Sequence, residues 1–245
     1  MHSGIINDWI DKRNNYIREF TFSVFIILDQ YSEIERKHLK KNRETSSDFN
    51  IFNFFKIKET IHSVLVGNLL NPIAEHGQGN LFLIQFLNQL GIDDPHEGRW
   101  NVTIESGRVD ILIKRNHPHS VIIIENKSND ANDQPGQLYR YWYNEIYLPN
   151  KSTNPKAELQ LYPENKYKIV YLVSDDNKEP EMHSLQRPQE NKYLGLPEKL
   201  IIPPIIWTFK IEIGTWLKSC LLLDGLKKDN IRIREYLQQY LEYWN

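Results

Sequence analysis

The chain has 245 residues and a formal net charge of −2 at pH 7; this length suits one domain with a substantial core, and the charge is not that of a dedicated nucleic-acid-binding protein. A single cysteine, Cys220, excludes an internal disulfide framework and a cysteine-based zinc cluster. The apolar runs are too short to span a membrane and the first residues lack the pattern of a secretory signal, so we expect a cytoplasmic protein without a membrane segment.

An N-terminal extension with a helical pattern comes first. The pattern runs from about residue 5 to residue 41, and the polar residues 44–48 follow it. We therefore expect residues 1–48 to form a helical extension and residues 49–245 to form the main domain, with both in one compact unit. The extension ends in a basic cluster that could follow the phosphates of a nucleic acid or could be a solvated helix end, formed by Arg36, Lys37, Lys40, Lys41 and Arg43.

Two shorter helices begin the main domain, at about 52–70 and 80–90. The first should end before Pro72, because the residue that precedes a proline disfavours the helical conformation. Between the two helices, His76 lies beside two glycines, but no lysine-serine or lysine-threonine pair follows them as in a Walker-type phosphate loop. His76 could contact a substrate phosphate or could cap the next helix.

Three strands are predicted next, at 99–105, 108–114 and 120–127. Ser106-Gly107 is a good tight-turn pair, so the first two strands should form a hairpin. The third strand contains four consecutive apolar residues before its charged end. Such a run indicates a buried strand rather than a solvated edge.

A helix, two more strands and two closing helices complete the predicted order. Asp130–Asp133 offers N-cap residues and Pro135 suits the first turn of a helix that reaches about residue 147. Its aromatic residues could stack on unpaired bases, although we favour packing against the sheet for Tyr139, Trp142 and Tyr143. The later elements are strands at 166–174 and 201–209, helices at 211–223 and 230–244, and two long polar loops at 149–163 and 175–197 that could shape substrate choice.

Two of the apolar strands carry charges, which are costly to bury unless something compensates them. Glu125 and Lys127 project from one face, because alternate residues of a strand share a face. If the two strands pair, Asp110 lies beside Glu125, and two carboxylates that close repel each other unless a cation or a proton lies between them. Mg²⁺ fits such a place, since one or two carboxylates commonly hold it, and the backbone carbonyl of Asn126 would add an oxygen ligand.

This arrangement resembles the PD-(D/E)XK nuclease superfamily, which includes many restriction endonucleases. Asp110 matches the first acid of its motif and Glu125-Asn126-Lys127 matches the E-x-K element, while Val109 stands where the motif has proline. Gln137 and Tyr141 match the Q-x-x-x-Y element of helicase–nuclease repair enzymes. These two residues are four apart, so both can lie on one face of a helix.

Flanking segments extend the resemblance over about residues 57–223. Residues 71–87 and 207–217 are similar to the corresponding segments of a bacterial family within the superfamily. The resemblance implies an α/β fold with a restriction-endonuclease-like core, in which helices flank a central mixed sheet of four to five strands.

The resemblance also implies a metal site. Asp110 and Glu125 would hold Mg²⁺, or Mn²⁺ in its place, with the Asn126 carbonyl as a further ligand. Glu59 is a candidate for the glutamate that the first core helix of the superfamily often carries near the metal. An ordinary surface position is the alternative for Glu59.

Further residues receive roles from the same resemblance. Lys127 would polarise the attacking water and stabilise the transition state. Gln137 would orient the nucleophile, and Tyr141 would bind the backbone phosphate as well as take part in catalysis. His76 and Arg108 are expected to contact the substrate.

The predicted function is that of a metal-dependent nuclease, an endo- or exodeoxyribonuclease that cuts nucleic acid, with DNA as the expected substrate, and that serves in bacterial defence against phage. A homodimer would suit cleavage of both strands of a duplex with one site per chain, and a protein partner could activate the enzyme. The alternative is a degenerate module with the nuclease fold that binds a protein or a nucleic acid without cutting it.

Overall fold

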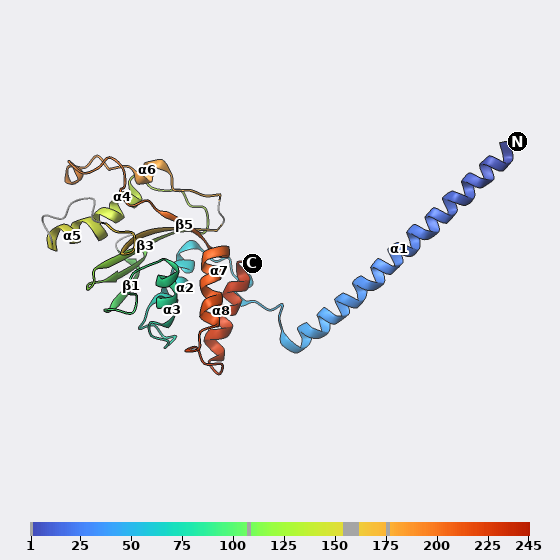
Figure 1. Cartoon of the computed structure of the whole chain (residues 1–245), viewed down its shortest axis with the longest axis horizontal. Coiled ribbons are helices and arrows are strands. Elements are labelled where there is room, and N and C mark those ends of the chain that lie inside the picture. The colour runs from blue at the N-terminus through green and yellow to red at the C-terminus, as the bar shows by residue number, and fades with distance from the viewer. Residues whose placement is uncertain (1, 107–108, 154–161, 175–176) are drawn as a thin grey trace. The chain divides into compact units, whose positions relative to one another are not determined.

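The computed structural model describes residues 2–106, 109–153, 162–174 and 177–245 (Figure 1). The chain divides into two units, Met1–Asn50 and Ile51–Asn245. Within the described residues, no helix has the length and apolar character that crossing a membrane requires.

The first unit consists mainly of one helix, α1 (His2–Thr45), which has 44 residues. It extends the predicted helix at both ends. Several of its hydroxyl side chains donate to the helix's own carbonyl oxygens four residues earlier, as Thr21 Oγ1 does to Ile17 at 2.7 Å. Near the end, Glu33 forms ion pairs with Arg36 and, at 3.4 Å, with Lys37.

The second unit contains a five-stranded mixed sheet. Strands β1, β2 and β3 are antiparallel neighbours, and β4 and β5 continue the sheet parallel to β3. The order along the sheet is the order along the chain: β1 (Trp100–Ser106), β2 (Val109–Arg115), β3 (Ser120–Lys127), β4 (Tyr167–Val173) and β5 (Ile205–Thr208). This sheet confirms the predicted fold class.

Helices cover both faces of the sheet (Figure 1). On one face, isoleucines of β2 and β3 pack against helices α2 (Glu59–Leu70), α3 (Leu81–Gln89), α7 (Gly214–Leu221) and α8 (Ile231–Tyr243). On the other face, Leu112 and Ile123 pack against the segment that begins with α4 (Gln137–Tyr141). That segment continues through a π-helical turn into α5 (Leu148–Thr153), and α6 (Met182–Leu185) contacts α4.

Three predictions about helices were wrong. The helix expected from residue 52 begins at Glu59, because Phe52 belongs to a short 3₁₀ turn whose ring packs 5.2 Å from that of Tyr240 on α8. The helix expected after Asp130–Asp133 begins at Gln137, with Gly136 as its N-cap. The single helix expected to residue 147 changes to π-helical geometry at Trp142.

The last predicted strand is shorter than expected. It begins at Ile205 rather than 201, directly after Pro203 and Pro204. Prolines have no backbone N–H to donate to a neighbouring strand, so they do not continue the ladder. The edge strand β5 therefore has only four residues.

Candidate active site

The charged residues of β2 and β3 meet at one edge of the sheet. The antiparallel register pairs Ile111 with Ile124 and Leu112 with Ile123. Asp110 lies one step beyond that ladder, and its Oδ2 accepts a hydrogen bond of 2.6 Å from the backbone N–H of Asn126. The structure thus brings Asp110 next to the E-x-K element.

Four buried side chains form one hydrogen-bonded network beside Asp110. Glu125 Oε1 accepts from Lys127 Nζ at 2.9 Å and from Gln137 Nε2 at 2.8 Å. Gln137 Nε2 also donates to Tyr141 Oη at 3.0 Å. All four are buried. The Q-x-x-x-Y pair of α4 therefore lies in direct contact with the charged end of β3.

The second oxygen of Glu125 has no hydrogen-bond partner although it is buried. Burial, reinforced by repulsion from Asp110, raises the pKa of Glu125. Burial also raises the pKa of Asp110, and the charge of Glu59 adds to the effect. A divalent cation would balance these carboxylates and use the free oxygen, so the residues present fit a metal with oxygen ligands.

The carboxylates alone do not make a complete metal cage. In the part of the chain that the structure describes, no group of three or more His, Cys, Asp or Glu side chains has the arrangement of a metal site. A metal held by Asp110 and Glu125 would need other oxygens, such as a backbone carbonyl, waters and a substrate phosphate. Mg²⁺ is commonly bound in this way.

Glu59 and Asn126 connect the site to α2. Glu59 is the first residue of α2, where its carboxylate accepts from the backbone N–H of Asn129 at 3.3 Å. The side chain of Asn126 donates to the Glu59 carbonyl at 2.8 Å and to Ser63 Oγ at 2.9 Å. The amide nitrogen of Asn126 therefore anchors the end of β3 to α2, and its Oδ1 accepts from the Ser128 N–H at 3.1 Å, so the backbone carbonyl is the oxygen of Asn126 that could bind a metal.

A polar pocket opens over these residues. Its lining comes from α2, β2, β3, the loop after β3, and α4: Glu59, Asp110, Glu125, Lys127, Ala131, Asn132, Gln134, Gln137 and Tyr141. Every residue predicted to act in catalysis lines this one pocket.

Asp133 is a residue of the site that the sequence reasoning missed. Its side chain is buried, and Oδ1 lies 3.5 Å from Lys127 Nζ and accepts from Tyr171 Oη at 3.0 Å. Its other oxygen accepts from the backbone N–H of Glu181 at 2.8 Å. The sequence signal that could have identified Asp133 is its position between the E-x-K and Q-x-x-x-Y elements. The local pattern instead indicated a helix cap.

One predicted substrate contact, His76, does not lie with the predicted catalytic residues. His76 uses both ring nitrogens within its own turn, since one contacts the Asn71 carbonyl at 3.0 Å and the other accepts from the Gln78 N–H at 3.0 Å. It does not line the pocket that Asp110 lines, and the N-cap of α3 is Asn80, so the contacts of His76 stabilise its own turn. Arg108 lies outside the described residues.

Packing explains two of the aromatic residues on the helix after β3. Tyr139 and Trp142 are fully buried, with their ring centroids 5.2 Å apart in an edge-on contact. The Tyr143 ring lies 4.8 Å from that of Tyr193. Tyr139 and Trp142 therefore have no free face for a nucleic-acid base.

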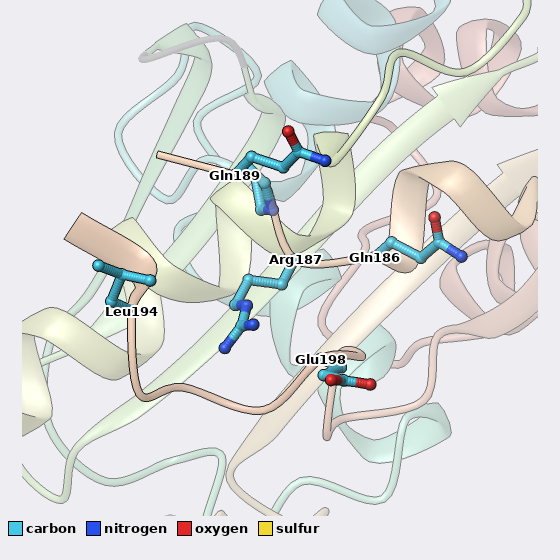
Figure 2. Close-up of a pocket in the computed structure, with 6 residues that line it drawn as sticks. Gln186, Arg187, Gln189, Leu194 and Glu198 are labelled. Carbon is cyan, nitrogen blue, oxygen red and sulfur yellow. The ribbon is translucent and has the colours of Figure 1, made fainter. Parts of the chain in front are cut away.

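The loop between β4 and β5 covers the start of α4. It contains a second pocket, whose side chains Figure 2 shows around Arg187. Gly136 donates its N–H to the His183 carbonyl at 2.7 Å, has a φ of 64°, and lies so close that an added Cβ would meet Pro188 at 2.7 Å. The loop therefore fixes the position of the residue that precedes Gln137.

Comparisons with known proteins give one match. A family model described as PD-(D/E)XK nuclease superfamily matches residues 49–242. No curated protein and no solved structure matches the chain. The matched range includes the whole sheet and every residue of the polar pocket, and it begins after α1.

Proposed function

The chain belongs to the PD-(D/E)XK nuclease superfamily, and on that basis we propose that it is a metal-dependent nuclease that hydrolyses phosphodiester bonds in DNA. The single observation that carries this proposal is the pair formed by the half-buried Asp110 and the buried Glu125, which has an oxygen without a partner and a lysine beside it. Members of the superfamily generally use divalent metals.

In this proposal Asp110, Glu125 and the backbone carbonyl of Asn126 hold Mg²⁺, or Mn²⁺ in its place. Glu59 lines the same pocket and would contact the metal through a water molecule. When bound, the metal supplies a water of lowered pKa and neutralises charge on the phosphate.

Lys127 is assigned to the transition state. Burial lowers the pKa of its ammonium, but the carboxylates of Glu125 and Asp133 outweigh this and raise the pKa overall. The side chain therefore remains charged at neutral pH, next to the place where negative charge builds on the phosphate. A fixed positive charge there stabilises that build-up without reorganisation during the reaction.

Gln137 and Tyr141 are assigned to orientation and phosphate binding. Gln137 donates to both the Glu125 carboxylate and the Tyr141 hydroxyl, so it holds the carboxylate in one rotamer and can orient the attacking water. Burial raises the pKa of Tyr141. The hydroxyl stays protonated and can donate to a phosphate oxygen.

The resemblance to restriction endonucleases supports the wider setting of the proposal. We place the protein in the cytoplasm and in bacterial defence against phage, where a partner protein could control the activity. Arg108 remains a proposed substrate contact.

Cleavage assays test the proposed function directly. Supercoiled plasmid, single-stranded circular DNA and structured RNA are incubated with Mg²⁺, Mn²⁺ or EDTA. The wild type should cut DNA only with a divalent metal, Asp110→Asn should not cut, and Asp224→Asn, a change at an exposed acid outside the pocket, should behave as the wild type. Cutting in EDTA, or by Asp110→Asn, would contradict the proposal. Absence of both cutting and metal binding would favour the degenerate binding module.

A further inference from the structure

A regular apolar stripe runs along α1. We call Ile17, Phe20, Val24, Ile27, Tyr31 and Ile34 the seam; successive members are separated by three, four, three, four and three residues. This alternation places all six on one side of the helix. It is the spacing of the a and d positions of a heptad repeat.

The seam is exposed within its unit. Its six side chains are between 37% and 66% exposed, with Val24 the least and Ile34 the most. In the sequence the same spacing continues toward the N-terminus at Ile10 and Ile6, with Arg13 as the one interruption. At the other end it stops at His38, whose ring contacts the carboxylate of Asp48 at 3.0 Å.

The surroundings of the seam suit close approach of another helix. Thr21 and Ser23 flank it, and their hydroxyls donate to the carbonyl oxygens of Ile17 and Glu19 at 2.7 and 2.9 Å. Since these donors are satisfied within the helix, covering them would leave no hydroxyl hydrogen unpaired. The ion pairs of Glu33 lie away from the seam positions and would stay in solvent.

We propose that α1 associates along the seam with α1 of another copy of this chain to form a coiled coil. A three-four apolar repeat is matched by another helix with the same repeat, because each knob then meets a hole of the facing helix. The six side chains offer on the order of 600 Å² per chain, close to the roughly 800 Å² per partner of a standard interface. β-Branched residues at both seam positions also suit assemblies of more than two helices.

The association joins nuclease domains without using their surfaces. The family match begins at residue 49, so α1 is additional to the matched domain. An assembly through α1 carries at least two copies of the polar pocket, which is what cleavage of both strands of a duplex requires when each chain has one site. The association itself does not depend on the proposed nuclease activity.

Apolar residues off the seam provide a matched control. Phe22 and Phe25 are 68% and 71% exposed and occupy other sides of the same stretch of helix. A contact that depended only on general apolar surface, such as binding to lipid, would involve them as much as the seam. A coiled coil involves Val24 and Ile27 instead.

The test measures the mass of the full-length protein in solution by light scattering and sedimentation. The wild type should be a dimer or a larger homo-oligomer. The seam variant Val24→Glu/Ile27→Glu should be a monomer, while Phe22→Glu/Phe25→Glu should keep the wild-type mass, although it removes more apolar surface. An unchanged thermal unfolding midpoint of the second unit would show that the seam variant is folded.

Three results would overturn the proposal. The wild type could be monomeric at tens of micromolar, and its association would then be weaker than we expect for a specific coiled coil of this length. The control variant could dissociate as fully as the seam variant, which would assign the contact to general apolar surface. The wild type could be monomeric in buffer and bind vesicles of phosphatidylcholine and phosphatidylglycerol, which would assign α1 to a lipid surface.

Discussion

Two groups of ionisable side chains lie close to the first turn of α2, and the protein accommodates them in opposite ways. In one group, Asp110 and Glu125 lie together with an oxygen that lacks a partner. In the other, His62 is buried among aromatic rings and hydrogen-bonds Tyr240 Oη at 2.9 Å. The histidine has only to stay neutral, whereas the carboxylates repel each other. Unresolved repulsion of this kind is typical of sites that await a ligand, and it separates the candidate active site from an ordinary buried polar contact.

The largest effect should come from Lys127→Ala. Removal of one fixed charge from the transition state should lower turnover by on the order of a hundredfold or more, measured at saturating Mg²⁺. Lys168→Ala is the matched control, because Lys168 is a sheet lysine that pairs with Glu164 at 3.5 Å outside the pocket. Near-wild-type turnover in Lys127→Ala would remove its assigned role.

The second prediction concerns His62, the other ionisable group of the comparison. Burial lowers the pKa of His62 from 6.5 to about 4. The unfolded chain therefore takes up this proton below about pH 6.5 while the folded protein does not, so the free energy of unfolding should fall as pH drops from 6.5 toward 4, by about 2 kcal/mol. Urea unfolding at several pH values should show that His62→Gln lacks this part of the pH dependence. Equal slopes in the two proteins would contradict it.

The third prediction tests Asp133, which joins Lys127 to the rest of the site. Asp133→Asn keeps an acceptor for the Glu181 N–H but removes the charge 3.5 Å from Lys127. Turnover should fall about tenfold, the size of one hydrogen bond to a charged group, while the Michaelis constant changes little. Tyr171→Phe removes only the donor to Asp133 and should have a smaller effect. A larger loss in Tyr171→Phe than in Asp133→Asn would contradict the assignment of the effect to the charge of Asp133.

The smallest change in stability, and the one that is an increase, is expected for Glu125→Gln. In metal-free protein this change removes the repulsion from Asp110 and gives the second oxygen position a donor. The free energy of unfolding should rise by about 1 kcal/mol, or the melting temperature by about 3 °C, in EDTA at pH 7. Activity should be lost in the same variant. A destabilised Glu125→Gln protein would mean that the ion pair with Lys127 outweighs the repulsion.

The parts of the molecule that were predictable from sequence are those fixed by local pattern. The bounds of β3 follow from its run of apolar residues, and the register that brings Asp110 to Glu125 follows from pairing two strands whose charged positions share a face. The fold class followed from the order of motifs around this pair. Alternation and spacing are carried by the chain itself, so they need no knowledge of distant contacts.

The remainder depended on contacts between distant residues. Asp133 is a residue type that commonly caps helices, but its two oxygens accept hydrogen bonds from Tyr171 Oη and from the backbone N–H of Glu181. Phe52 has the pattern of a helix, but the aromatic residues of α8 hold it in a 3₁₀ turn. In each case a group from a distant segment outweighed the local preference, and the neighbouring sequence does not indicate that partner.

The close contact between Gly136 and Pro188 couples the position of α4 to that of the loop between β4 and β5. Since no side chain fits between them, a change in the position or length of the loop between β4 and β5 would also move Gly136, the residue that precedes Gln137. A designer who exchanged this loop to change what the pocket accepts would therefore also be adjusting the carboxylate that Gln137 holds. Selectivity and rate would have to be altered together in this molecule.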